Sequence, residues 1–518
     1  MKTLCEKNKK EILHIFIFFL ISLIFTLVIA LFEASRDDAI AHISRIYNLA
    51  QSFKNGNFDP YIYESCYLNL GYPYGIFYPD VFLKPFAFLV YCGMNEYLSY
   101  VLMIFTINFA TMLITYSVMK TIKKEFAFIV TICYFIYPYR IFDLIWRSAV
   151  GELFFFAFLP IVILGIYKIF YENKFSWSLA IGLLCILNSH ILSTALTLVF
   201  LLIFYIGNTH KIIKNPKILT WTIVNAGITI LCSLNVVIPI LEAQLTEQLV
   251  YNSNPAFFGT VSSHATSLIS GNYGIYLSIF VILCLAISLF FIIKYKAKKM
   301  FVVWLMLSLI ISTTNLFPWV LLEKILPFVS IIQFPSRLLA FAIIPYVLLI
   351  CFVLNSKKSQ KIILVSLYVF SILFSALFNS ASQSVYNFDD VLYRGIGQGD
   401  YLSVEFDTFL EANEYNTSNS LNSINVQIST ENVCYTSNGY VAKLFYKNYK
   451  IMDSDNKEYE YQNKNGLIFI PELEAENKEV VVTYVPTVYQ NISKYLSYVS
   501  VIALCIVIIA QKRKQSIV

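Results

Sequence analysis

Charged residues are scarce in this chain. They make up 14% of its 518 residues, while hydrophobic residues make up 58%, and the mean hydropathy is +0.66. A typical soluble domain carries about 25% charged residues. The composition of this chain therefore excludes a typical soluble domain. The Lys and Arg residues that are present stand in short clusters between apolar runs, which excludes a nucleic-acid-binding stripe. The sequence therefore predicts a polytopic membrane protein.

Several signatures of common enzymes are missing as well. The five histidines are scattered without the spacing of a zinc site, and none of the ten cysteines belongs to a CxxC pair. The sequence has no Walker A loop and no GxSxG elbow. These absences exclude P-loop nucleotide hydrolases and α/β-hydrolases of the usual kinds.

Long apolar runs are abundant, and the basic clusters between them predict how they cross the bilayer. The first run, Ile12–Leu31, follows four lysines, and positive residues stay on the cytoplasmic side. Placing every later basic cluster inside predicts about twelve transmembrane helices with both termini cytoplasmic. The predicted membrane domain covers 1–379, with a first external loop over 33–96, and a final helix with a basic tail covers 495–518.

Between 380 and 494 the composition becomes polar, and apolar residues alternate with polar ones. The runs Tyr440–Tyr446 and Val480–Val485 are examples. Alternation of this kind is typical of strands with one buried face. We therefore expect a small β-rich external domain attached to an α-helical membrane protein.

An acidic pair, Asp37 and Asp38, directly follows the first apolar run. It opens an amphipathic segment with the pattern of a helix lying in the headgroup region. The polar side of that helix would carry Asp38, His42, Arg45, Asn48 and Ser52. A carboxylate here can act as a general base on an incoming hydroxyl or hold a divalent metal such as Mg or Mn. It can equally be the N-cap of the helix. His42 and Arg45 either bind a phosphate or extend toward lipid headgroups.

A second cluster contains Arg140, Asp143, Arg147 and Glu152. Spacings of three and four residues place the first three on one side of a helix. One interpretation is a local ladder of ion pairs. The other is that Arg147, with Arg140, binds phosphate oxygens while Glu152 orients Arg147. We favour the second, because an Arg and a Glu at the edge of hydrocarbon are costly unless they are used.

Two further residues are candidates for the same site. His190 ends a short apolar run, where it either packs or contacts a ligand. Arg337 follows Pro335 at the start of a predicted inward helix. It is either a second phosphate contact or an interface anchor.

Taken in chain order, these segments resemble a known family. They are Asp37-Asp38 with His42 and Arg45, Gly71-Tyr72-Pro73 with Phe77-Tyr78-Pro79, Arg147 to Leu153, Asn188-Ser189-His190, and Phe334 to Arg337. This order is similar to the GT-C superfamily of integral membrane glycosyltransferases, and more narrowly to its bacterial YfhO-like branch. Part of that branch carries the label "6-pyruvoyl-tetrahydropterin synthase-related", but no residue here resembles a pterin-binding zinc site. The likeness covers essentially the whole membrane part.

The resemblance implies a catalytic base or metal ligand in the first external loop, which maps to Asp37 or Asp38. It also implies a polyprenyl-phosphate-linked sugar as donor. We expect transfer to a glycopolymer or glycolipid of the cell envelope, on the outer face of a bacterial cell membrane. The donor phosphate would contact Arg147, Arg337, Arg140 and Arg45, with His42, Glu152 and His190 in support. No cofactor beyond the divalent metal is implied.

Two alternatives stay open. The chain can be a transporter or flippase of a lipid-linked saccharide, although charged residues at the middle of the predicted helices, which would favour one, are not evident. It can also be a non-catalytic membrane protein whose external domain binds envelope polymers. The acidic pair distinguishes these alternatives from the enzyme, because only the enzyme requires it.

Overall fold

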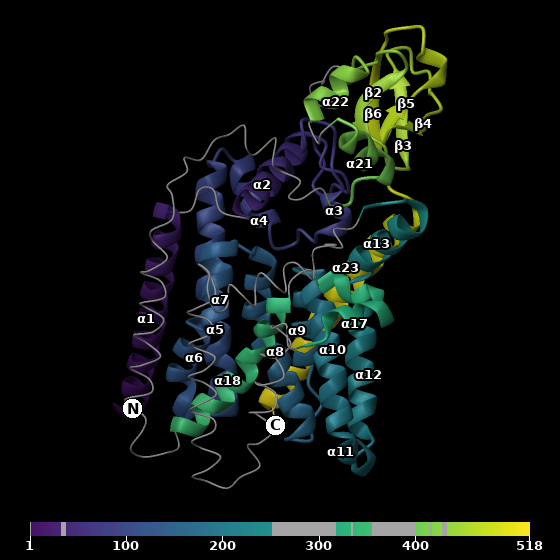
Figure 1. Ribbon diagram of the computed structural model, residues 1–518. Helices are drawn as coiled ribbons and strands as arrows, with labels where there is room; N and C mark the ends of the chain where they lie inside the picture. Colours follow the sequence, from purple (N-terminus) through teal and green to yellow (C-terminus); the bar gives the residue numbers. More distant parts are fainter. Residues whose placement is uncertain are drawn as a thin grey trace.

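The computed structural model describes residues 2–32, 38–250, 317–332, 335–354, 400–413, 417–426 and 433–517. Most of these residues are helical, and the strands all fall in the C-terminal part. Long helices lie side by side, and a small β-rich domain (residues 400–484) projects beyond one end of them (Figure 1). The predicted division into a helical part and a smaller β-rich part is therefore confirmed.

Four described helices are long and apolar enough to cross a bilayer. They are α1 (Lys2–Phe32), α5 (Glu96–Ile122), α8 (Val150–Phe170) and α23 (Val488–Ile517). Two bent pairs raise the number to six if each pair is one span. The first joins α6 (Ala127–Phe135) to the segment from Pro138 at 43°, and the second joins α12 (Lys217–Leu231) to α13 (Leu234–Thr246) at 70°.

The predicted count of about twelve helices exceeds what the described residues contain, for two reasons. The runs predicted at 276–293, 301–311 and 362–378 lie outside the described residues. Two other predicted crossings are short helices, α9 (Ser178–Leu187) and α10 (Ile191–Gly207). At 1.5 Å per residue, α9 extends only about 15 Å, half of a hydrocarbon core.

The remaining described elements are shorter. They are α2 (Ala39–Lys54), α3 (Tyr74–Phe77), α4 (Lys84–Tyr91), η1 (Lys124–Phe126), α7 (Pro138–Phe142), η2 (Asp143–Arg147), α11 (Thr209–Lys214), α17 (Trp319–Ile325), η3 (Pro327–Ile332), η4 (Pro335–Leu338), α18 (Leu339–Leu354), α21 (Val404–Glu411), α22 (Thr417–Ser423) and η6 (Pro471–Leu473). The strands are β1 (Val433–Tyr435), β2 (Tyr440–Leu444), β3 (Tyr449–Asp453), β4 (Gln462–Lys464), β5 (Leu467–Phe469) and β6 (Glu479–Tyr484).

Small residues allow α8 and α9 to pack closely. A Cβ added at Gly165 would lie 2.4 Å from the backbone nitrogen of Leu179, and one added at Gly182 would lie 2.7 Å from that of Val162. Glycine is therefore required at both contacts, as at many interfaces between membrane helices. This contact holds the second half of α8 against α9, which ends shortly before His190.

The helix predicted after the acidic pair is present as α2, but its environment differs from the prediction. Its apolar side is buried, as expected, with Ile43 and Ile46 fully covered. Its polar side is also covered by protein, since Arg45 and Asn48 are buried. The predicted amphipathic helix is therefore present, but the buried part of its polar side packs on protein instead of facing headgroups, because α4 and α5 pack against α2.

The β-rich domain contains two antiparallel three-stranded sheets, ordered β1-β6-β3 and β2-β5-β4. Both alternating runs noted in the sequence form strands, β2 and β6. In β6, Val480 and Val482 point into the domain while Glu479 and Val481 are exposed. The final helix begins at Val488, seven residues before the predicted boundary at 495.

The β-rich domain rests on the first loop. The backbone N–H of Leu444 donates to Leu70 O at 2.8 Å. A short strap, residues 400–404, pairs with residues 248–250. Three backbone hydrogen bonds of 2.7–2.9 Å link Tyr401, Leu402 and Val404 to that segment. The strap passes over the first loop, where the ring of Tyr401 stacks on Phe77 at 4.2 Å.

Candidate active site

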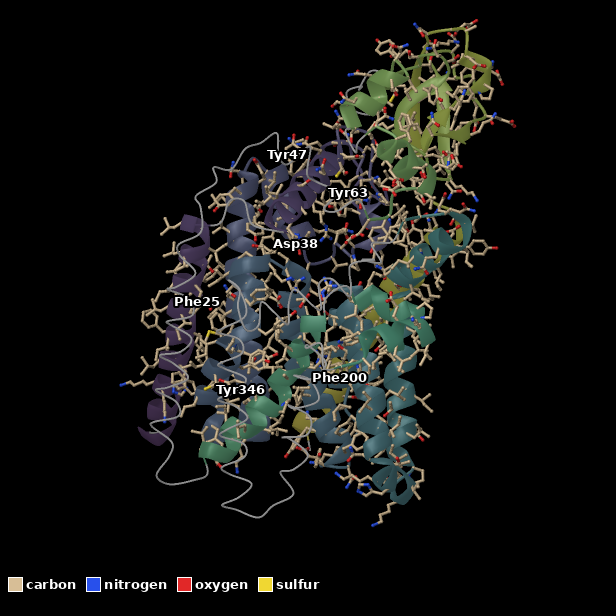
Figure 2. The ribbon with its side chains drawn as sticks, in the orientation of Figure 1. Phe25, Asp38, Tyr47, Tyr63, Phe200 and Tyr346 are labelled. Carbon is tan, nitrogen blue, oxygen red and sulfur yellow. The ribbon has the colours of Figure 1, made fainter. Side chains whose placement is uncertain are left out.

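The site begins where α2 begins. Asp38 occupies the N-cap position, and its side chain is exposed and makes no capping hydrogen bond. Its backbone N–H donates to the carbonyl of Arg147 at 3.1 Å. Figure 2 shows Asp38 between the first loop, marked by Tyr47 and Tyr63, and the helices that carry Phe200 and Tyr346. Asp37, the other predicted acidic residue, lies outside the described residues.

Glu152 connects two arginines that are far apart in the sequence. Its Oε1 accepts hydrogen bonds from Arg147 Nη1 at 2.7 Å and from Arg337 Nε at 3.0 Å. Its Oε2 accepts one from the hydroxyl of Tyr139 at 3.1 Å. Arg147 also pairs with Asp143 at 2.9 Å. The predicted role of Glu152, orienting Arg147, agrees with this geometry, and the structure adds Arg337 to the same carboxylate.

The chain reaches this arrangement through an irregular bend. Residues Asp143–Arg147 form one turn of π-helix, and Ser148 follows in the left-handed region with φ +51°. The N–H of Ala149 then donates to Asp143 O at 3.0 Å, and α8 starts at Val150. Residues five apart lie about 140° apart around a regular α-helix, so the bend is what brings Arg147 and Glu152 together.

Arg140 does not join this cluster. Its Nη2 donates to Asn108 Oδ1 at 2.7 Å and its Nη1 donates to Phe135 O at 3.2 Å. Its guanidinium also lies 4.2 Å from the ring centroid of Phe135. The predicted ladder is therefore present only as the Asp143–Arg147 pair, because Arg140 precedes the π-helical turn and points toward α5.

Arg45 is held in a pocket of the first loop. Its Nη2 donates to the carbonyls of Tyr78 and Pro79, both at 3.2 Å. The rings of Tyr74 and Tyr78 lie 5.3 and 5.2 Å from its guanidinium carbon. Arg45 is only 4% exposed, so it does not extend toward headgroups.

The charge of Arg45 is not balanced locally. Within the described part of the chain, Arg45 forms no ion pair and its Nε has no hydrogen-bond partner. A buried cation without a carboxylate is costly. It is therefore a natural contact for an anion such as phosphate.

Two histidines lie beside these arginines. His190 caps α10, and its Nδ1 accepts from the N–H of Ser193 at 3.3 Å. The ring is packed so closely on Gly151 that a Cβ there would lie 2.7 Å from it. Burial lowers the pKa of His190 to about 4, and the charges of Glu152, Arg337, Arg147 and Arg45 act on it next. His190 is thus neutral at pH 7.

The pKa of His42 is lowered by burial in the same way as that of His190. Its Nδ1 lies 3.4 Å from Arg45 Nη1. Burial, and then the charge of Arg45, lowers the pKa of His42 well below its usual value. Because the Nδ1 of each neutral histidine faces a donor, the proton is on Nε2. Both histidines therefore present an N–H donor without adding charge.

Four contributors to the site were not predicted from the sequence. Tyr139 bonds to Glu152, while Tyr74 and Tyr78 surround Arg45. Tyr78 belongs to the Phe77-Tyr78-Pro79 motif quoted from the sequence and Tyr74 directly follows Gly71-Tyr72-Pro73, which was the available signal. Tyr139 follows Pro138 in a similar Tyr-Pro-Tyr segment. The strap residue Tyr401 is a fourth, and its position more than 300 residues after Tyr78 gave no signal.

The described residues contain no group of three or more His, Cys, Asp or Glu side chains placed to hold a metal ion. The predicted metal ligands are Asp37 and Asp38, of which only Asp38 is described. Its single carboxylate does not form a metal site by itself. The predicted divalent metal therefore stays a prediction.

No protein-family model matches this chain. Comparison with curated proteins also finds no match. The likeness to GT-C glycosyltransferases therefore rests on the sequence motifs quoted above and on their order in the chain.

Proposed function

We propose that this chain is a GT-C-type membrane glycosyltransferase, which moves a sugar from a polyprenyl-phosphate-linked donor to a cell-envelope acceptor on the outer face of the membrane. One observation carries the proposal. Arg147 and Arg337 share the carboxylate of Glu152, and the backbone N–H of Asp38 donates to the carbonyl of Arg147. The charges of these two arginines and of Arg45 all act on His190, in a chain with helices that are apolar enough to cross a bilayer. A donor used outside the cell needs a lipid carrier, and its phosphate needs cations at the membrane edge.

In the proposed reaction each residue acts as the base, as a phosphate contact or as a hydrogen-bond donor. The oxygen of the acceptor hydroxyl bonds to the anomeric carbon of the donor sugar while the bond to the phosphate oxygen breaks. The hydroxyl proton passes to the Asp38 carboxylate, with Asp37 as the alternative base. The arginines neutralise the charge on the departing phosphate. The Nε2–H groups of His42 and His190 add uncharged donors.

Glu152 supports this role without touching the substrate. A guanidinium has five N–H donors in a fixed fork, so anchoring some of them sets the direction of the rest. The bonds to Glu152 set the planes of Arg147 and Arg337 in this way. Arg140, which bonds to Asn108, is left out of the proposed phosphate site.

Transfer of a labelled sugar tests the proposal. A panel of polyprenyl-phosphate sugars and envelope extracts is offered to purified wild-type protein, Asp37→Asn, Asp38→Asn and the double variant in lipid. We expect loss of the general base to reduce transfer about 10²–10⁴-fold, with donor binding retained. Glu411→Gln, on the exposed side of α21, is the control. Full activity in both single Asp variants would overturn the assignment of the base.

The larger architecture is part of the same proposal. We infer that the apolar runs outside the described residues complete a GT-C arrangement of about twelve helices with cytoplasmic termini, since basic clusters flank them as they flank the described helices. Labelling of single cysteines placed in each predicted loop, from either side of sealed vesicles, tests this. Loops that label from the side opposite to the predicted one would contradict the topology.

One observation favours a second candidate, a flippase of a lipid-linked saccharide. Arg140 is fully buried and bonds to Asn108, near the middle of α5. Charged residues at that depth often mark a substrate path. Movement of a fluorescent lipid-linked saccharide across proteoliposomes, lost in Arg140→Gln but kept in Asp38→Asn, would favour this candidate over the enzyme.

A further inference from the structure

Lysine and arginine residues gather at the end of the helices opposite the β-rich domain, around α11 and the C-terminus (Figure 1). They belong to three segments: 171–177 between α8 and α9, 209–217 along α11 to the start of α12, and 511–513 near the end of α23. Together they form the basic surface, whose cations are Lys174, Lys211, Lys214, Lys217, Lys512 and Arg513.

Hydrogen bonds between side chains hold the three segments together. The amide of Asn215 donates to Asn173 Oδ1 at 3.1 Å, which joins the first segment to the second. The indole N–H of Trp177 donates to Gln511 Oε1 at 2.8 Å, which joins the first segment to the third. The basic surface is therefore one region of the folded protein, although its segments are far apart in the sequence.

The charge of the basic surface is not neutralised by the segments that form it. Glu172 is their one acidic residue, and it pairs with Lys174 at 3.6 Å. Lys214, Lys217 and Lys512 are exposed, and none of them forms an ion pair with a described residue. Closely spaced like charges repel one another, so an anion that binds among them is stabilised.

Aromatic rings accompany these cations. Lys211 Nζ lies 4.0 Å from the ring centroid of Tyr171, a cation–π contact that leaves ammonium N–H groups for a further acceptor. In the same segment as Tyr171, Phe175 and Trp177 pack edge to face with their ring centroids 4.6 Å apart. Tyr and Trp are enriched where the polar and apolar parts of a bilayer meet. The basic surface thus has the composition of a membrane interface.

Exposed apolar side chains begin directly beside the basic surface. Ile206 of α10 is 65% exposed, Leu219 of α12 is 47% exposed and Ile509 of α23 is 53% exposed. Each lies two or three residues from a basic segment. An anionic lipid matches this combination, since its phosphate contacts cations while its chains contact hydrocarbon side chains. A soluble anion would use only the cations.

We propose that the basic surface binds the headgroup of an anionic phospholipid, with the acyl chains along the exposed sides of α10, α12 and α23. The lysine ammonium groups donate hydrogen bonds to the lipid phosphate. Because the cations come from all three segments, a bound headgroup also holds the end of α23 beside α9 and α11. This binding does not depend on the proposed transfer reaction.

Native mass spectrometry of the full-length protein in detergent measures the binding. Phosphatidylglycerol is the probe, and phosphatidylcholine with the same acyl chains is the comparison. We expect the wild type to bind phosphatidylglycerol more tightly. Lys214→Gln/Lys217→Gln/Lys512→Gln should raise the Kd for phosphatidylglycerol about 100-fold, since each lysine beside an anionic lipid contributes about fivefold. All three side chains are exposed, so an unchanged unfolding temperature should confirm that the fold is retained.

The matched control removes the same charge from another basic region. Lys9→Gln/Lys10→Gln/Lys124→Gln changes exposed lysines of α1 and η1, outside the basic surface. The Kd of this control for phosphatidylglycerol should equal that of the wild type. The comparison separates binding at the basic surface from attraction by net charge.

Three results would overturn the proposal. Equal affinity of the wild type for phosphatidylglycerol and phosphatidylcholine would show that the headgroup charge is not recognised. Equal weakening by the two triple variants would show attraction by net charge instead of binding at the basic surface. Displacement of phosphatidylglycerol by an equal concentration of sn-glycerol 3-phosphate would show a site for a soluble anion instead of a lipid.

Discussion

At the scale of single residues, the shared carboxylate of Glu152 has the largest expected effect. Its removal takes from Arg147 and Arg337 the buried carboxylate that they share, while Arg147 keeps its pair with Asp143. Breaking a buried charge pair by removing one partner costs about 3–5 kcal/mol. We therefore expect Glu152→Gln to lower the unfolding temperature clearly in detergent.

The matched control for Glu152 is Glu172→Gln. Glu172 is half-buried and pairs with the exposed Lys174 at 3.6 Å, and substitutions at such surface pairs change stability by about 0.5 kcal/mol or less. Thermal unfolding of both variants beside the wild type checks the contrast. Equal unfolding temperatures for Glu152→Gln and the control would show that Glu152 does not hold the arginines.

The neutral histidines predict a dependence of stability on pH. The pKa of His190 is about 4 in the folded protein and 6.5 ordinarily. Between these values the unfolded chain binds a proton that the folded protein does not, so stability falls as the pH drops from 6.5 to 4. The slope from this group is at most about 1.4 kcal/mol per pH unit.

His190→Gln tests that slope, because glutamine can still accept from Ser193 but does not titrate. Unfolding is measured between pH 4 and 7 in the wild type and the variant. The variant should show a smaller loss of stability in this window, and part of the loss should persist because the pKa of His42 is lowered too. Identical slopes in both proteins would contradict a neutral, buried His190.

At the scale of elements, the bend between α7 and α8 decides which side chains meet. Regular helical spacing places Arg140, Asp143 and Arg147 on one side, as predicted, but the π-helical turn after Phe142 moves Arg147 toward Glu152. A π-helical turn depends on its packing more than on local sequence. For that reason the pairing of Arg147 with Glu152 could be predicted from proximity, whereas the separation of Arg140 could not.

Ser148 provides a test of the bend. It is fully buried in the left-handed region with φ +51°, and its hydroxyl has no hydrogen-bond partner among the described residues. Ser148→Gly should be neutral or stabilising by up to about 1 kcal/mol, because glycine adopts this φ freely. Ser148→Val should cost about 1–3 kcal/mol, because a β-branched residue resists it. Equal stability of the two variants, measured by thermal unfolding, would contradict this account.

At the scale of the whole molecule, local patterns and distant contacts were not equally predictable. The amphipathic pattern placed α2, and alternation placed β2 and β6, because each depends on neighbours in the sequence. The carbonyls of Tyr78 and Pro79 around Arg45, and the strap over Phe77, come from chain that is distant from α2. No periodicity in α2 could predict them, so its polar side was wrongly placed in the headgroup region.

Ion pairs and a hydrogen bond connect the last helix, α23, to the first loop. Asp59 lies 2.5 Å from both Lys84 and Lys494, and Tyr498 donates to it at 3.0 Å. Asp80, next to the carbonyls that hold Arg45, pairs with the same Lys84 at 3.3 Å. This network connects α23 to the segment that surrounds the site. Asp80 is buried, but Asp59, Lys84 and Lys494 are partly exposed, so each of the two pairs at Asp59 contributes only about 0–1 kcal/mol to global stability.

We therefore expect Lys494→Met to change local more than global stability. Hydrogen exchange of the backbone amides between 75 and 84 should become faster, because one of the two lysines that fix Asp59 is lost. The unfolding temperature should move little. Lys450→Met, which removes an exposed pair with Glu458 at 3.7 Å, should leave exchange in that segment unchanged. Unchanged exchange in both variants would show that α23 does not support the loop around Arg45, and that the site depends on the first loop and the strap alone.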